Sequence, residues 1–261
     1  MPLREYSNLG WPETPYAADQ RPVAKHVRLL TGMSILWADA GEKAVPIGAA
    51  AVFIPVHRTA RRDIAADTLH FGYRAVTVGH DTDAADTGIL AFLDGILVQA
   101  RREAEIIALH SFADDIHGLR PLLTTPYAGI DSVTEAWNDR SRRERATAML
   151  VDTADDGMQL DSALTAARLD FGRELWRHRA PMVLQQAYED LWSSTGRATN
   201  RDWHTQHIGA AGVMSALAVA LIAGRQTQRL DWAGVFNAAE PLGRVAWDTF
   251  PLVLALDELQ D

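Results

Sequence analysis

The chain has 261 residues, of which 48% are hydrophobic, so it can bury a sizeable core as one large domain or two small ones. The absence of cysteine excludes disulfides, thiolate nucleophiles and zinc–thiolate sites, and any metal would need carboxylate or imidazole ligands. The formal net charge of −9 argues against nucleic-acid binding over the whole surface, but it leaves room for a local basic patch.

Arginine supplies almost all of the positive charge, because Lys25 and Lys43 are the only lysines. The arginines gather in four clusters, at residues 58–62, 101–102, 140–145 and 173–179. Such clusters are more often solvated helix faces than ligand sites, although arginine is also the better bidentate partner for phosphate.

The sequence predicts neither a membrane span nor a secretory signal. Even the apolar segment Ala210–Ala223 is rich in small residues and falls short of the about 20 residues that a spanning helix needs. Met1–Gln20 lacks the basic-then-apolar layout of a signal peptide. We therefore expect a cytoplasmic protein with no membrane association.

The amino-terminal half begins with an arm and then predicts strands. Residues 1–22 combine prolines and aromatic residues without a clear period, which indicates an extended arm before a single domain at 23–261. Three runs of strand length follow, two of them apolar and the third alternating: Met33–Asp39, Pro46–Val56 and His70–Val78.

Helices and strands alternate in the next part of the chain. After the turn-rich loop Gly79–Gly88, apolar residues recur at helical spacing from Ile89 to Ala100. Ala104–Leu109 is typical of a buried strand, and Asp114–Leu123 predicts a short helix. The polar stretch Thr124–Arg145 is expected to be peripheral.

The carboxy-terminal part predicts one more strand and then helices only. The strand is Ala148–Thr153, and the expected helices are Ser162–Arg179, Pro181–Ser193, His204–Gly224 and Pro241–Glu258. The whole order is therefore three strands, a helix, a strand, a helix, a strand and a helical tail.

This order resembles the RNase H-like α/β fold, a mixed sheet of about five strands, three antiparallel and then parallel, with flanking helices. From Ile106 the chain reads IIALHSFADDIHGL, which resembles the second motif of DnaQ-like 3′–5′ exonucleases of the DEDD superfamily. On this resemblance His110, Ser111 and Asp115 take the places of the family's His, Asn and Asp, while Asp114 replaces its Phe.

Three further segments resemble motifs of the same family. MSILWADAGEKAVPIGAAAVFIPV is similar to the first motif and puts Asp39 at its first acid. LVDTADDGMQL is similar to a later strand and assigns Asp152 and Thr153 to its Asp-Thr pair. The segment that starts at His207 resembles the last helix, in which the family has His, four residues and Asp.

The resemblance implies hydrolysis of phosphodiesters in single-stranded DNA or RNA by two divalent cations, Mg²⁺ or Mn²⁺, held by carboxylates. The implied metal ligands are Asp39, Asp115 and Asp152, and the implied general base is His207, because imidazole titrates near working pH. These four residues are the catalytic set that the resemblance assigns.

Two positions depart from the family pattern. The acid expected two residues after Asp39 is replaced by Gly41, and the acid expected after His207 is replaced by Gly212. Neither glycine can bind a metal. Two hypotheses therefore stand: a divergent metal-dependent exonuclease, or a nonenzymatic relative that keeps the fold to bind nucleic acid or a protein partner.

Each of these residues also has a simpler structural interpretation. Asp39 and Asp152 suit turns, Asp115 beside Asp114 suits the first turn of a helix, and His110 suits a buried site at a strand end. His204 and His207 would share a helix face and form a metal pair only with a third ligand. A minor alternative is an HD-type metal phosphohydrolase built on a His-Asp pair, with these contributing residues: His80, Asp81, His57, His110 and Asp115.

Overall fold

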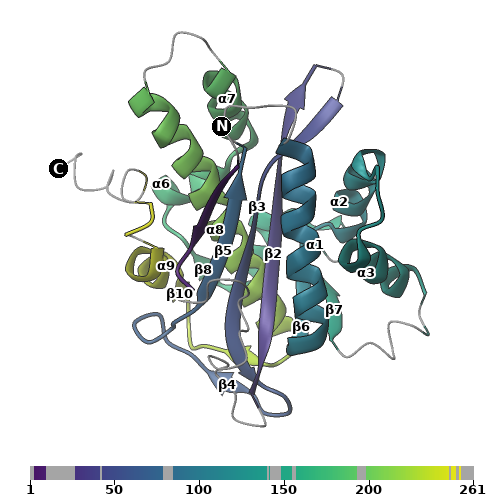
Figure 1. Cartoon of the computed structure of the whole chain (residues 1–261). Coiled ribbons are helices and arrows are strands. Elements are labelled where there is room, and N and C mark those ends of the chain that lie inside the picture. Colours follow the sequence, from purple (N-terminus) through teal and green to yellow (C-terminus); the bar gives the residue numbers. More distant parts are fainter. Residues whose placement is uncertain are drawn as a thin grey trace, which may run out of the picture.

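The protein is an α/β domain built on a six-stranded mixed sheet, with a helix-rich carboxy-terminal part (Figure 1). The computed structural model describes residues 3–9, 27–41, 43–78, 85–139, 141, 148–154, 157–192, 198–246, 248–250 and 253. The sheet order is β1-β5-β3-β2-β6-β7. The strands are β1 (Arg4–Ser7), β2 (Val27–Ala40), β3 (Lys43–His57), β5 (Gly72–Thr77), β6 (Ala104–Leu109) and β7 (Met149–Asp152).

The sheet is antiparallel on one side of β2 and parallel on the other. β1, β5, β3 and β2 pair successively in antiparallel fashion, whereas β6 is parallel to β2 and β7 is parallel to β6. β2 pairs with β6 only over Leu29–Gly32, so the second half of β2 pairs with β3 alone. The β2–β3 hairpin therefore extends beyond the carboxyl end of β6.

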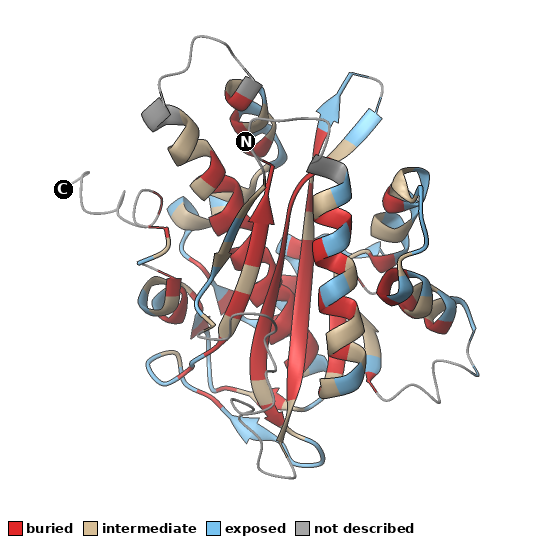
Figure 2. Cartoon of the chain, viewed as in Figure 1, coloured by how far each residue is buried: buried red, intermediate tan, exposed pale blue. Residues whose placement is uncertain are grey.

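Helices cover both faces of the sheet. The long helix α8 (Ala198–Gln226) lies behind the sheet in Figure 1 and packs on β2, β3 and β5, while α1 (Ala85–Glu103) crosses the front. α2 (Phe112–Leu119) follows β6, and α3 (Ala128–Asn138) packs on α1. Buried apolar residues form a core on each side of the sheet (Figure 2).

The remaining described elements are short, apart from α7, and surround this framework. They comprise the helices α5 (Leu160–Ala167), α6 (Arg173–Trp176), α7 (Pro181–Trp192) and α9 (Ala239–Ala246), the 3₁₀ turns Arg120–Leu122 and Arg177–Arg179, and the strand pairs β4 (Arg62–Asp63) with β9 (Leu230–Asp231) and β8 (Leu169–Asp170) with β10 (Phe236–Asn237).

The central contact between α8 and the sheet depends on small residues. A Cβ placed on Gly32 of β2 would lie 2.4 Å from the Ala216 carbonyl oxygen and 2.7 Å from the Ala220 Cβ. Backbone atoms cannot move aside as a flexible side chain can, so helix and strand touch only because position 32 lacks a side chain.

We therefore expect Gly32→Ala to destabilise the protein by about 2 kcal/mol through overpacking, measured as a lower urea midpoint. Gly95→Ala on α1 is the matched control, because a Cβ there meets nothing within 4 Å and alanine favours the helix. Equal stability of the two variants would contradict this account of the contact.

The structure differs from the sequence-based predictions at four places. The arm at 1–22 contributes the edge strand β1, and the stretch 124–145 contains α3, whose Ile130 and Val133 are buried. The single helix expected at 162–179 is broken, because Arg168 and Gly172 have φ values of 54° and 72°. The last predicted helix, 241–258, overlaps α9, which ends at Ala246, and much of its remainder lies outside the described residues.

One helix is longer and more apolar than the sequence-based prediction about membrane spans allowed. Residues 201–226 of α8 are long and apolar enough to cross a bilayer, although the prediction was that no run approaches that length. The apolar window of this helix is entirely buried within the fold, so packing of the protein itself accounts for its composition.

Candidate functional site

Asp152 ends β7 and ties it to the start of α2. Its Oδ1 accepts hydrogen bonds from the backbone N–H groups of Ser111 and Ala154, each at 2.9 Å, and its Oδ2 accepts one from Phe112 at 2.9 Å. Ser111 has φ 60°, a left-handed conformation that a non-glycine residue adopts only when its surroundings hold it. The carboxylate of Asp152 thus positions the turn between β6 and α2.

Asp115 lies in the first turn of α2 and contacts the extended part of β2. The indole Nε1–H of Trp37 donates to its Oδ1 at 3.0 Å. Burial raises the pKa of Asp115 to about 7, and the negative charges of Asp114 and Asp152 add to the rise. The carboxylates of Asp115 and Asp152 therefore interact electrostatically.

Asp39 lies near the tip of the β2–β3 hairpin and is exposed. Side chains alternate along a strand, so Asp39 shares the sheet face of Trp37, two residues earlier. Only its backbone has a described partner: the amide of Gln185 in α7 accepts from its N–H at 2.8 Å and donates to its carbonyl at 3.0 Å. Asp39 is seven positions beyond Gly32, the last β2 residue paired with β6.

His207 lies in α8, and its side chain is fully buried. Its Nε2–H donates to the carbonyl oxygen of His178 at 2.8 Å, and Nδ1 is buried without a hydrogen-bond partner in the described part of the chain. Burial lowers the pKa of His207 to about 4. The imidazole is therefore neutral at neutral pH and enclosed by Trp203 and His178.

The other residues of the second motif lie at the carboxyl end of β6. His110 Nδ1 is 3.0 Å from the hydroxyl oxygen of Thr153, and burial lowers the pKa of this imidazole. Ser111 precedes α2 in the left-handed conformation, and Asp114 is exposed in the first helical turn, where a negative charge favours the helix dipole. This part of the motif has clear structural uses.

The two glycines at expected acidic positions also have structural uses. Gly41 forms the turn of the β2–β3 hairpin with φ 73°, a conformation that favours glycine. A Cβ on Gly212 would lie 3.2 Å from the Cβ of Ala50, so α8 approaches β3 closely at this point. Side chains at both positions would disturb the hairpin or the core.

The residues of the other metal hypotheses are separated or lie outside the described residues. His57 ends β3 beside the start of β2, whereas His110 follows the carboxyl end of β6, so they occupy opposite ends of the sheet. His80 and Asp81 lie outside the described residues. His204 Nε2 is 3.7 Å from an Asp190 carboxylate oxygen, while His207 faces the His178 carbonyl.

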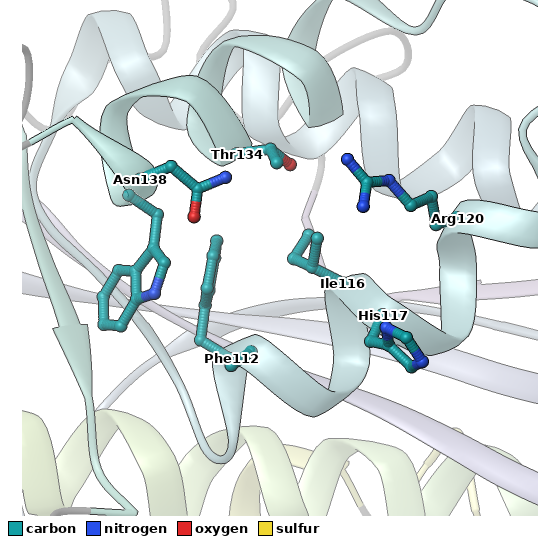
Figure 3. Close-up of a pocket in the computed structure, with 8 residues that line it drawn as sticks. Phe112, Ile116, His117, Arg120, Thr134 and Asn138 are labelled. Atoms are coloured by element: carbon teal, nitrogen blue, oxygen red, sulfur yellow. The ribbon is translucent and has the colours of Figure 1, made fainter.

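A hollow of about 180 Å³ lies between α2 and α3 (Figure 3). Asp115 is not among the residues that line it. Phe112 and Ile116 form its floor, and Arg120 and Asn138 lie on opposite sides of it. This hollow could not be found from the sequence, because α3 forms one of its walls and the stretch 124–145 was expected to be peripheral.

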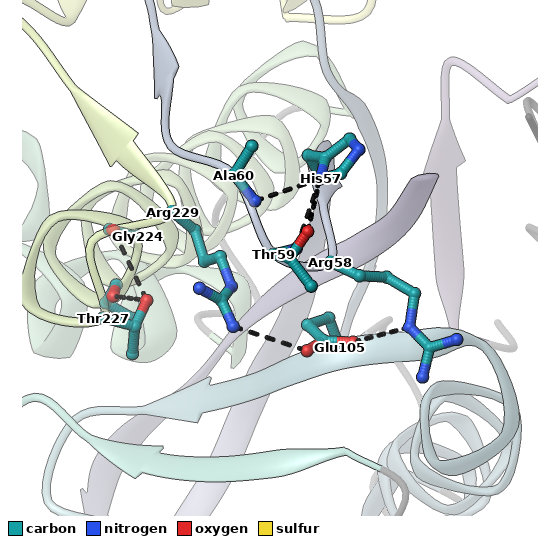
Figure 4. Close-up of polar contacts among 9 residues, drawn as sticks. His57, Arg58, Thr59, Ala60, Glu105, Gly224, Thr227 and Arg229 are labelled. Atoms are coloured by element: carbon teal, nitrogen blue, oxygen red, sulfur yellow. Dashed lines mark hydrogen bonds and ion pairs between the residues drawn. The ribbon is translucent and has the colours of Figure 1, made fainter. Parts of the chain in front are cut away.

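A second feature gathers at the opposite end of the sheet, where β2 and β6 begin. Arg58 and Arg229 contact the two oxygens of Glu105, each at 3.6 Å (Figure 4). The arginine surface comprises seven arginines that hydrogen bonds and ion pairs connect here, together with Arg101, which precedes Arg102 in the last turn of α1; the seven are Arg28, Arg58, Arg61, Arg62, Arg102, Arg225 and Arg229.

The arginine surface is only partly neutralised. Four carboxylates lie among its residues, namely Asp63, Glu103, Glu105 and Asp231. Arg62 and Arg28 donate to backbone carbonyls, and no carboxylate partner is described for them. Arg58 and Arg61 have side chains that are 50% and 58% exposed, so they can reach an external anion.

The loop that carries Arg58, Arg61 and Arg62 is held in place locally. His57 Nδ1 accepts hydrogen bonds from the backbone N–H groups of Thr59 at 3.2 Å and Ala60 at 3.0 Å (Figure 4). The sequence predicted the clusters at 58–62 and 101–102, but not that the fold adds Arg28, Arg225 and Arg229.

No protein-family model matches the sequence, and neither the curated proteins nor the solved structures include a significant match.

Proposed function

We propose that the chain is a noncatalytic RNase H-like domain that binds nucleic acid through the arginine surface, in the cytoplasm. The strand order supports the first part of this proposal. Three antiparallel strands, β5, β3 and β2, continue into the parallel strands β6 and β7, which is the arrangement that the RNase H-like resemblance implies. Strand order alone establishes no function, which depends on the side chains.

The donor set does not fit a two-metal centre. The oxygens of Asp152 already accept three backbone hydrogen bonds, and Oδ1 of Asp115 accepts one from the indole N–H of Trp37. His207 is fully buried, and its Nε2–H donates to the carbonyl oxygen of His178. A general base has to reach the proton that it removes. These observations favour the nonenzymatic hypothesis.

The arginine surface is the single observation that carries the binding proposal. A chain with a net charge of −9 places eight arginines against four carboxylates at one end of its sheet. Phosphate is the ligand for which the guanidinium fork is best suited, and nucleic acids present phosphates in series. The partner that this surface fits is therefore the backbone of DNA or RNA.

The test is a fluorescence-anisotropy titration of labelled single-stranded DNA and RNA between about 50 and 200 mM NaCl. We expect the Arg58→Ala/Arg61→Ala/Arg62→Ala variant to bind at least about 30-fold more weakly at the lowest salt, and its salt slope to become shallower by about 2 on these single strands. The side chains of Arg58 and Arg61 are exposed, so their ion pairs contribute little stability, and the variant should fold. Arg173→Ala, an exposed arginine on α6, is the matched control and should bind like the unchanged protein.

The same samples decide between binding and catalysis. Incubation with Mg²⁺ or Mn²⁺ should leave the labelled strands intact. Degradation that is lost in Asp115→Asn would instead establish the divergent exonuclease, for which the proximity of Asp115 and Asp152 is the favouring observation. Equal binding by the triple variant and the unchanged protein would show that the arginine surface is not the binding site.

A further inference from the structure

The hollow between α2 and α3 has the size of one aromatic ring. Its volume of about 180 Å³ is close to the about 150 Å³ of an engineered apolar cavity that binds benzene. Its floor is apolar and rigid, because the Phe112 ring packs on Trp137 with centroids 4.4 Å apart and an interplanar angle of 34°. Phe112 itself is buried in the core, so this floor is fixed by the fold.

The polar groups around the hollow favour an anion. Arg120 and His117 are the only ionisable residues in its lining, and both are basic side chains. In the part of the chain that the structure describes, the Arg120 guanidinium has no carboxylate partner although it points toward the hollow (Figure 3). The Thr134 hydroxyl donates to the Ile130 carbonyl at 2.7 Å, so the lining side chains with donors that have no described partner are Arg120, His117 and Asn138.

We propose that this hollow is a binding site for a small planar aromatic anion. The ring lies on Phe112 and Ile116, and its carboxylate or phosphate group pairs with the Arg120 guanidinium. Asn138, on the opposite side, is placed to hydrogen-bond a polar substituent of the ring. This site lies at the carboxyl end of β6, whereas the arginine surface lies at the other end, so it goes beyond nucleic-acid binding.

The probes are benzoate and phenyl phosphate, tested by saturation-transfer NMR and by calorimetry on the full chain. We expect ring-proton saturation transfer and a Kd of about 1 mM for at least one probe, and the tighter probe identifies the anion. Neutral benzyl alcohol and non-planar cyclohexanecarboxylate should bind at least about tenfold more weakly, because one lacks the charge and the other the flat ring.

Two variants test separately the charge of Arg120 and the open volume of the hollow. Arg120→Gln should weaken binding of the tighter probe at least about tenfold, and Ala113→Leu, which fills the hollow from the exposed rim of α2, should abolish it. Arg173→Gln is the matched control and should bind normally. Absence of binding at about 10 mM, or binding that neither variant changes, would overturn the proposal. Neither result would affect the arginine-surface titration, so the two proposals can fail separately.

Discussion

Asp152→Asn is expected to lower the free energy of unfolding by about 3 kcal/mol at pH 5.5, with no metal present. Asparagine has one acceptor oxygen, so it cannot accept all three backbone N–H groups, and its amide N–H would face one of these donors. The substitution also removes the negative charge at the start of α2. Urea unfolding followed by circular dichroism measures the change.

The direction of this change separates the two roles of Asp152. A carboxylate held near other carboxylates to bind metal destabilises the metal-free protein, so neutralising it would raise stability. A carboxylate that positions the β6–α2 turn stabilises the protein, so neutralising it lowers stability. Asp114→Asn, at the same helix start but exposed, is the control and should cost at most about 1 kcal/mol. A more stable Asp152→Asn variant would contradict the structural role.

Asp115→Asn is expected to raise the free energy of unfolding by up to about 4 kcal/mol at pH 8 and to leave it nearly unchanged at pH 4. The pKa of Asp115 is raised to about 7 by burial, so the folded state keeps its proton between pH 4 and 7 while the unfolded state loses it. Stability therefore falls as the pH rises through this window. Asparagine keeps an oxygen for Trp37 and does not ionise.

His207 changes the free energy of unfolding in the opposite direction over nearly the same pH range. Its pKa is lowered to about 4 in the folded state, so stability rises as the pH increases from 4 to about 6.5. The two effects offset each other in the unchanged protein, and a single pH profile would hide both. The informative quantity is the stability of Asp115→Asn minus that of the unchanged protein, measured by urea unfolding at each pH unit. A difference that does not change with pH would contradict the raised pKa of the half-buried Asp115.

The strands of the sheet could be predicted from sequence, but the register between them could not. Met33–Asp39 and Ala104–Leu109 are apolar runs of strand length, and both are strands. The runs do not reveal that β6 pairs only as far as Gly32, because pairing is set by the three-dimensional fold. The prediction that Asp39 stands at the end of a strand, before a turn and a second strand, is confirmed, but the sequence did not show that this end of β2 extends beyond β6.

The environment of individual side chains was the least predictable part. Helical spacing around His207 indicates a helix but not that the residue is enclosed on all sides, since α8 is apolar around most of its surface. The turn interpretation of Asp152 is supported by its bond to the Ala154 N–H, while its bonds to α2 depend on β6 and β7 being neighbours. The arginine surface likewise needs the chain to bring residues 28, 58 and 229 together.

The salt dependence of binding is the most direct test of the proposal that the arginine surface binds nucleic acid. For the unchanged protein we expect the logarithm of the association constant to fall linearly with the logarithm of the NaCl concentration, with a slope of about −4 or steeper on duplex DNA. Replacing Arg58, Arg61 and Arg62 by alanine should make that slope shallower by about 3, the share of three phosphate contacts. An unchanged protein that binds neither DNA nor RNA at about 50 mM NaCl would contradict the proposed function.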